Sequence, residues 1–211
     1  SKIPKLINEL KEGKSIALVS DAGMPNICDP GENLVRYVKA SDLDIICIPG
    51  PCAAITALVS TGFSASKFIF EGFLPKKKKE RHKVLSDISQ NEKTTVLYES
   101  PHRFNKLLFE LKDFCGGHRE IHVSRELTKK FEEHFCDSID GIIESFKDRE
   151  IIGEITIVIK GLDKNKSKDF NESLLKKELY ELISAGLSLS AASRYLAKKK
   201  NLTKKVIYNL Y

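Results

Sequence analysis

Residues 19–31 read VSDAGMPNICDPG and directly follow the apolar run SIALV at residues 15–19. Two glycines, two prolines and two aspartates stop both a helix and a strand ladder from continuing through this stretch. Thirteen residues are more than a plain turn requires. We interpret the apolar run as a short buried strand and the following loop as a candidate ligand-binding loop, with a simple crossover loop as the alternative.

The surrounding pattern predicts alternating helices and strands. Apolar residues at helical spacing over residues 3–10 predict a helix that stops at Gly13, and LVRYVKA from Leu34 predicts another. DIICIPG at residues 44–50 predicts a second strand. This order is typical of a parallel α/β sheet, in which ligands bind beyond the carboxyl ends of the strands. The loops SDAGMP and PGPCAA would lie there, the second leading into a helix from Ala53 whose free N–H groups favour anions.

The second half of the chain repeats the α/β pattern. Strands are predicted at residues 67–75, 94–100, 120–127 and 154–161, and helices at residues 84–89 and 101–114. A boundary near residues 64–67 separates a domain over residues 1–66 from a second over residues 67–162. Residues 163–211 form a polar linker and a helical tail, with Gly186 between the first two helices and Thr203 as an N-cap of the third.

Length and composition indicate a soluble globular protein. The 211 residues, 41% of them hydrophobic, suffice for one large or two modest domains. The chain has neither a membrane-length apolar run nor a signal peptide, and its five cysteines form no C-x-x-C pair, so we expect a cytoplasmic location. Cys115, His118 and His122 have spacing that could suit zinc, but a fourth ligand is missing and no metal site is predicted.

Positive charge is concentrated at the C-terminal end. The net charge is +6, and residues 164–211 hold eleven Lys/Arg against four Asp/Glu, a surplus of +7. The preceding residues therefore sum to about −1. This asymmetry favours a polyanionic partner, and solvated surface lysines are the alternative.

Six segments occur in an order that resembles a known family: VSDAGMPNICDPG, PGPCAAITALVSTG, FEGFLPKK, YESPHRF, SRELTKKFEE and GEITIVI. Together they resemble the ribosomal RNA branch of the tetrapyrrole methylase superfamily, and more narrowly its bacterial 16S rRNA cytidine 2'-O-methyltransferases. The resemblance covers nearly the whole chain. It implies two α/β domains with a cofactor cleft between them, S-adenosyl-L-methionine as methyl donor, a decoding-region cytidine in 16S rRNA or the 30S subunit as substrate, and a homodimer.

The resemblance also implies roles for individual residues. The expected cofactor-binding residues are Val19, Ser20, Asp21, Met24, Cys52 and Ala53. Met24 replaces the family's usual threonine, and Cys28 and Cys52 replace serines, so polar contacts by these side chains are not expected. Nothing corresponds to the family's first strand and glycine-rich loop, which implies an N-terminally incomplete chain, and a fragment of this kind can be inactive.

A ribose hydroxyl becomes a useful nucleophile when a carboxylate or imidazole within hydrogen-bond reach takes its proton. The catalytic candidates are Glu99, His102 and Glu126, since Asp21 fits a cofactor or turn-capping role better. A structural ion pair with Arg125 or Lys129 is the alternative for Glu126. Cations that can anchor RNA phosphates form a separate predicted set, which consists of Arg103, Lys129, Lys76, Lys77, Lys78, Lys79 and Arg81.

Two other functional classes remain open from the sequence. One is a sister methylase that acts on a tetrapyrrole or on a modified histidine of an elongation factor, although the basic tail and SRELTK argue against it. The other is a DNA-binding regulator, because the spacing around AGLSLSAASRYLA resembles a helix-turn-helix. Sequence-specific duplex binding would distinguish the regulator.

Overall fold

A computed structural model describes residues 2–163, 175–199 and 204–211. The chain forms two compact units that divide between Gly161 and Leu162, close to the predicted start of the tail. The predicted boundary near residue 66 lies inside the first unit and stays a prediction. Among the described residues, no helix is both long and apolar enough to cross a lipid bilayer.

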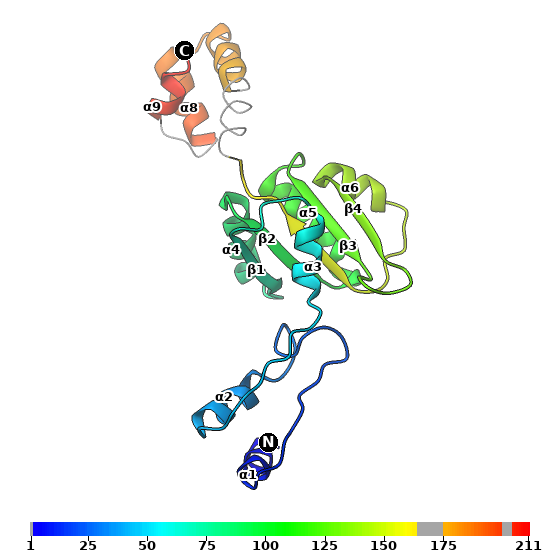
Figure 1. Cartoon of the computed structure of the whole chain (residues 1–211). Helices are drawn as coiled ribbons and strands as arrows, with labels where there is room; N and C mark the ends of the chain where they lie inside the picture. The colour runs from blue at the N-terminus through cyan, green and yellow to red at the C-terminus, as the bar shows by residue number, and fades with distance from the viewer. Residues whose placement is uncertain (1, 164–174, 200–203) are drawn as a thin grey trace. The chain divides into compact units, whose positions relative to one another are not determined.

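The first unit contains a five-stranded sheet with the order β1-β2-β5-β3-β4 (Figure 1). The strands are β1 (Phe68–Phe73), β2 (Thr94–Glu99), β3 (Glu120–Arg125), β4 (Glu133–Ser138) and β5 (Ile155–Ile159). β1 and β2 are parallel, whereas β5 is antiparallel to both β2 and β3, and β4 is antiparallel to β3. The α/β class is therefore confirmed, with a mixed sheet.

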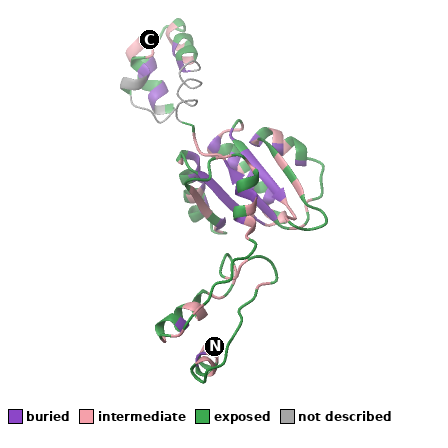
Figure 2. Ribbon diagram, in the orientation of Figure 1, coloured by how far each residue is buried: buried purple, intermediate pink, exposed green. Residues whose placement is uncertain are grey.

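Helices cover both faces of this sheet. α4 (Lys78–Gln90), α5 (Pro101–Cys115) and α6 (Ile139–Phe146) pack on the face that carries Leu97 and Ile157, where they form the main hydrophobic core. α3 (Ala53–Ser60) packs on the opposite face against Val96 and Val158. Successive side chains of a strand point to opposite faces of the sheet. Neighbouring residues of one strand therefore pack against helices on different sides. Figure 2 shows the three central strands, β2, β5 and β3, as mostly buried, whereas the edge strands β1 and β4 are mostly intermediate or exposed.

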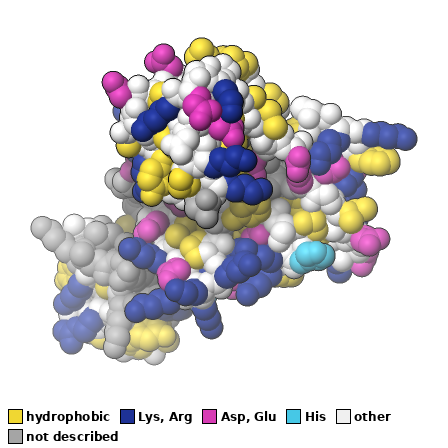
Figure 3. All heavy atoms as spheres, turned by 90° about the horizontal axis from the view of Figure 1, so that it is seen from below, with side chains coloured by type: hydrophobic (Ala, Val, Ile, Leu, Met, Phe, Trp, Pro, Cys, Tyr) yellow, Lys and Arg dark blue, Asp and Glu magenta, His cyan; other side chains and the backbone are white. Residues whose placement is uncertain are grey.

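The expected strands at residues 15–19 and 44–50 are wrong for the described structure. Both segments run as extended chain beside α1 (Ile3–Lys11) and α2 (Glu32–Ala40), and none of the described strands pairs with them. Their side chains are exposed, as Val19 at 81% and Ile46 at 84% illustrate. A strand requires a hydrogen-bonded neighbour, and apolar sequence does not supply one. Figure 2 shows these segments as exposed. On the face of the molecule seen in Figure 3, hydrophobic side chains lie among charged ones in general.

Two elements of the sheet region were not predicted. β4 is missed because EHFCDS is mostly polar, although it pairs with β3 over its whole length. α6 is missed because Gly141 interrupts a short apolar pattern. The helix begins at Ser138, whose hydroxyl accepts a hydrogen bond from the Gly141 backbone N–H at 3.1 Å.

The second unit is helical where it is described. Residues 175–184, α8 (Leu189–Lys199) and α9 (Lys204–Tyr208) form helices around a small core. Gly186 has a φ of 95° and follows the first of them, as the sequence predicts. The expected N-cap at Thr203 lies outside the described residues.

Candidate active site

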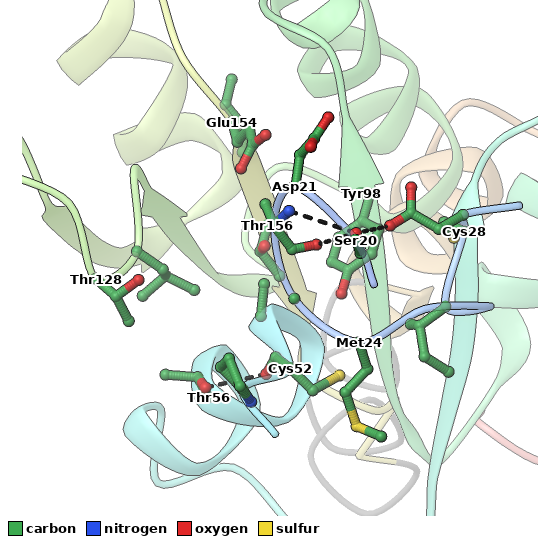
Figure 4. Close-up of a pocket in the computed structure, with 18 of the residues that line it drawn as sticks. Ser20, Asp21, Met24, Cys28, Cys52, Thr56, Tyr98, Thr128, Glu154 and Thr156 are labelled. Atoms are coloured by element: carbon green, nitrogen blue, oxygen red, sulfur yellow. Dashed lines mark hydrogen bonds between the residues drawn. The ribbon is translucent and has the colours of Figure 1, made fainter. Parts of the chain in front are cut away.

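A cavity of about 800 Å³ lies in the first unit at one edge of the sheet. The edge is formed by the carboxyl ends of β1, β2 and β3 and by the start of antiparallel β5. The lining comprises residues 18–24, 27–30, 51–53, 56, 73, 98–101, 127–129 and 153–156. All six residues expected to bind a cofactor lie there, and Figure 4 labels Ser20, Asp21, Met24 and Cys52 among them.

The loop of residues 20–31 closes one side of the cavity. Within it the Ser20 hydroxyl donates a hydrogen bond to the Asp29 carboxylate (Figure 4). The loop can pack closely against β1 because Gly72, which faces Cys28 of the loop, has no side chain. A Cβ at this position would lie 2.6 Å from the Cys28 sulfur, and the φ of Gly72 is 62°, a value that other residues rarely adopt. Burial raises the pKa of the Cys28 thiol, so the sulfur stays neutral at this contact.

Tyr98 of β2 holds the N-terminus of α3 at the cavity wall. The Ala54 backbone N–H, in the first turn of the helix, donates to the Tyr98 hydroxyl oxygen at 3.0 Å. In the same turn, the Thr56 hydroxyl donates to the Cys52 carbonyl at 3.0 Å. Burial raises the pKa of Tyr98 to about 12, so the phenol keeps its proton at neutral pH and can donate it to a ligand.

Glu99 follows Tyr98 in β2, and its side chain points to the opposite face of the sheet, toward α4 and α5. Its carboxylate is fully buried, accepts from the Ser100 N–H at 2.8 Å and lies 3.2 Å from Arg103 Nε and 3.5 Å from Arg81 Nη1. Arg81 Nε also donates to Glu110 at 2.7 Å. Two cations and one amide N–H already contact the carboxylate oxygens. This arrangement suits a structural ion pair better than a proton acceptor.

Arg81 is a correction to the predicted phosphate-binding set. It is 4% exposed, and its guanidinium lies between Glu99 and Glu110 inside the unit, so it cannot share a surface track with the lysines before it. Arg103 is also engaged internally, since it donates to the Leu74 carbonyl at 2.8 Å. Lys76, Lys77, Lys78 and Lys79 are exposed, and three of them form the start of α4.

The loop after β3 brings Glu126, Lys129 and Glu154 together. Lys129 Nζ lies 2.9 Å from Glu126 and 3.2 Å from Glu154, and the Glu154 N–H donates to Glu126 at 2.9 Å. The lysine, followed by that N–H, holds the pKa of Glu126 below its usual range. Lys129 and Glu154 line the cavity, whereas Glu126 does not. The structure thus contains the ion pair that was the alternative reading of Glu126.

His102 is exposed in the first turn of α5, next to the cavity-lining Pro101, and does not itself line the cavity. The sequence reasoning missed Tyr98, Glu154 and Thr156 as cavity residues. For Tyr98 a signal existed in the alternation of side chains along the strand, which places it on the face opposite to Glu99. The pairing of Tyr98 with Thr156 is known only from the structure.

The fold and the cavity at the strand ends define a class of protein. Residues 2–142 match the family model described as "Tetrapyrrole (Corrin/Porphyrin) Methylases". Among solved structures, the methyltransferase CobJ has a TM-score of 0.58 at 17% identity over 76% of this chain and 70% of its own. Cobalt precorrin-4 methyltransferase has a TM-score of 0.56 at 16% identity over 75% and 69%. These likenesses show a shared fold.

The chain belongs to the tetrapyrrole methylase family. Within that family it is similar to proteins named ribosomal RNA small subunit methyltransferase I. The Synechocystis protein is 40% identical over 206 residues, which cover 98% of this chain and 74% of the relative. The Bacillus subtilis protein is 37% identical over 211 residues, which cover 98% and 72%.

Proposed function

We propose that this protein transfers a methyl group from S-adenosyl-L-methionine to the 2'-hydroxyl of a cytidine in the decoding region of 16S rRNA. The main support for this proposal is that all six residues expected to bind the cofactor line the same cavity. Relatives named for small-subunit ribosomal RNA support the substrate. The expected homodimer is part of the same proposal.

The cavity residues fit such a methyl donor. About 800 Å³ lies within the usual range for small-molecule sites. The loop of residues 20–31, together with Cys52 and Ala53, would hold the donor, and Tyr98 offers a protonated hydroxyl beside them. Met24 and Cys52 present sulfur and apolar surface, which suits contact by size and shape. When bound, this donor supplies an activated methyl group on a sulfonium.

The remaining requirement is acceptance of the proton from the ribose hydroxyl. Glu99 and Glu126 are engaged in ion pairs and are largely buried, which favours His102 or Asp21. Glu154 stays a candidate because its side chain is 71% exposed, so its ion pair with Lys129 is screened by solvent. An imidazole base would make activity fall at a higher pH than a carboxylate base would, because histidine is protonated at a higher pH than a carboxylic acid is. The pH dependence of the single-turnover rate in His102→Gln, Asp21→Asn and Glu154→Gln therefore separates the candidates.

The lysines before α4 fit a role in binding phosphate. Lys77 is the N-cap residue, and Lys78 and Lys79 follow it in the first turn. Cations are unfavourable there, because the N-terminus of a helix already carries partial positive charge. These lysines therefore weaken the helix slightly, and a ribosomal RNA backbone would offset the cost.

The experiment is a methyl-transfer assay with isotopically labelled S-adenosyl-L-methionine and either 30S subunits or a porphyrinoid acceptor. Label recovered as 2'-O-methylcytidine after nuclease digestion supports the proposal. Label found only in the porphyrinoid would favour the tetrapyrrole alternative suggested by the family description. Sequence-specific duplex DNA binding with no methyl transfer would favour the regulator.

A further inference from the structure

The C-terminal unit exposes most of the protein's tyrosines. Four of the six tyrosines in the chain lie after residue 161, and all four are about half exposed or more: Tyr180, Tyr195, Tyr208 and Tyr211. The core of the unit is instead aliphatic, built from Leu175, Leu179, Ala192, Leu196, Ala197 and Ile207. These aromatic rings therefore lie outside the buried core of the unit.

Three of these tyrosines and a lysine form two ring contacts, and we call the four residues together the tyrosine strip: Tyr180, Lys204, Tyr208 and Tyr211. The rings of Tyr180 and Tyr211 are 5.4 Å apart between centroids and inclined by 41°. Tyr208 lies three residues before Tyr211, and the Lys204 ammonium is 6.0 Å from its ring centroid. Lys204 also donates to the Ser190 hydroxyl at 2.8 Å, which fixes the lysine beside α8.

The charge of this segment decides what kind of partner the strip suits. Residues 164–211 carry a surplus of +7, and the exposed Lys177 lies one turn before Tyr180. A basic protein surface would be repelled by this charge and a neutral one would gain nothing from it, whereas a nucleic acid would be attracted. Aromatic rings combined with cations bind unpaired bases by stacking, because each base offers a flat π face once it is out of a duplex.

We infer that the tyrosine strip is a stacking surface for unpaired bases of RNA. This inference rests on the proposed RNA substrate and adds where its single-stranded bases would bind. Lys204 would meet a backbone phosphate, and Tyr180 and Tyr211 would each offer a ring face to a base. Binding of this kind tolerates any base sequence and needs no methyl donor.

The test measures binding of a fluorescein-labelled ten-nucleotide oligocytidylate by the full chain. We expect Tyr180→Ala and Tyr211→Ala each to weaken binding about fivefold to a hundredfold. Tyr180→Phe and Tyr211→Phe should restore it, because the ring is retained. Tyr37→Ala is the matched control, since Tyr37 and Tyr180 are both 50% exposed. Inorganic polyphosphate, which has charge but no bases, should bind the alanine variants as well as it binds the unaltered protein.

Three results would overturn the inference. They are unchanged RNA affinity in the alanine variants, an equal loss for polyphosphate, and a loss of self-association by sedimentation with RNA affinity retained. Circular dichroism confirms that each variant keeps its helices. Because the assay contains no methyl donor, its outcome is independent of whether methyl transfer to ribose occurs.

Discussion

The hydroxyl oxygen of Tyr98 accepts a hydrogen bond from the Ala54 N–H at 3.0 Å, which joins the end of β2 to the first turn of α3 at the cavity wall. This contact fixes the edge of the proposed cofactor site from the sheet side. The same hydroxyl keeps its own proton, because burial raises its pKa to about 12.

Replacing Tyr98 with phenylalanine should weaken cofactor binding. The Ala54 N–H loses its acceptor, and the cavity loses a donor, at about 1 kcal/mol for each. We expect the dissociation constant for S-adenosyl-L-methionine to rise about five- to thirtyfold in calorimetry. Tyr37→Phe is the control, since Tyr37 is exposed on α2. Equal affinity in Tyr98→Phe and the unaltered protein would contradict the assigned role.

Gly72 should tolerate alanine less well than Gly62 does. Both have positive φ values, 62° and 71°, so both substitutions strain the backbone by about 1 kcal/mol. Only at Gly72 would the new Cβ meet another atom, the Cys28 sulfur at 2.6 Å, whereas nothing lies within 4 Å at Gly62. We expect Gly72→Ala to cost about 1–3 kcal/mol more than Gly62→Ala in urea unfolding. Adding Cys28→Ala should recover much of the difference, and the same cost for both glycines would disprove this contact.

Glu99→Gln separates a structural carboxylate from a catalytic one. The substitution removes one of the two carboxylates beside the buried Arg81 and leaves Glu110 as its partner, so the free energy of unfolding should fall by about 1–3 kcal/mol. Residual activity at a temperature where the variant is folded should stay within about tenfold of the unaltered enzyme. A hundredfold loss of activity at unchanged stability would instead show that Glu99 takes part in the reaction.

The protein should lose stability on mild acidification through His122. This side chain is 5% exposed, its Nε2 lies 3.1 Å from the Ser124 hydroxyl and 3.2 Å from His134 Nδ1, and its Nδ1 has no hydrogen-bond partner among the described residues. Burial, and then His134, lower the pKa of His122 below its ordinary value near 6.5. The unfolded chain therefore binds the proton first as the pH falls.

The free energy of unfolding should be flat above about pH 7.5 and should decrease as the pH drops through 6.5, by up to about 1.4 kcal/mol per pH unit from this group. Urea unfolding at four pH values measures the slope. His122→Asn should flatten it, whereas His82→Gln, a change at an exposed helical position, should not. A slope that His122→Asn leaves unaltered would assign the pH dependence to other groups.

The sequence predicted most of the region from residue 68 to residue 159, because its strands and helices have clear apolar periods and bury them in one core. It failed at residues 15–19 and 44–50, where the apolar pattern is strong but no described strand pairs with it. An apolar pattern shows which side chains a segment can bury. Whether the segment pairs with another strand depends on the whole fold. β4 shows the converse: its sequence is mostly polar, yet it forms a strand because it pairs with β3.

The candidate site was predictable in part for the same reason. The small residues of two loops predicted a binding site, and the family resemblance implied Asp21 and Cys52 within them; both line the cavity. Motif position alone could not show that Glu99 faces the helical layer or that Arg81 is enclosed by two carboxylates. Those assignments depend on strand alternation and on contacts between residues distant in sequence.

The central claim is that the cavity between the loop of residues 20–31 and the start of α3 holds S-adenosyl-L-methionine. Calorimetry of the full chain, compared with Ala53→Trp, tests it most directly, because a tryptophan at Ala53 would fill the cavity without touching the main core. We expect one donor bound per chain to the unaltered protein and at least a hundredfold loss of affinity in Ala53→Trp, with little change in melting temperature. Equal binding by the two proteins, or no binding by either, would contradict it.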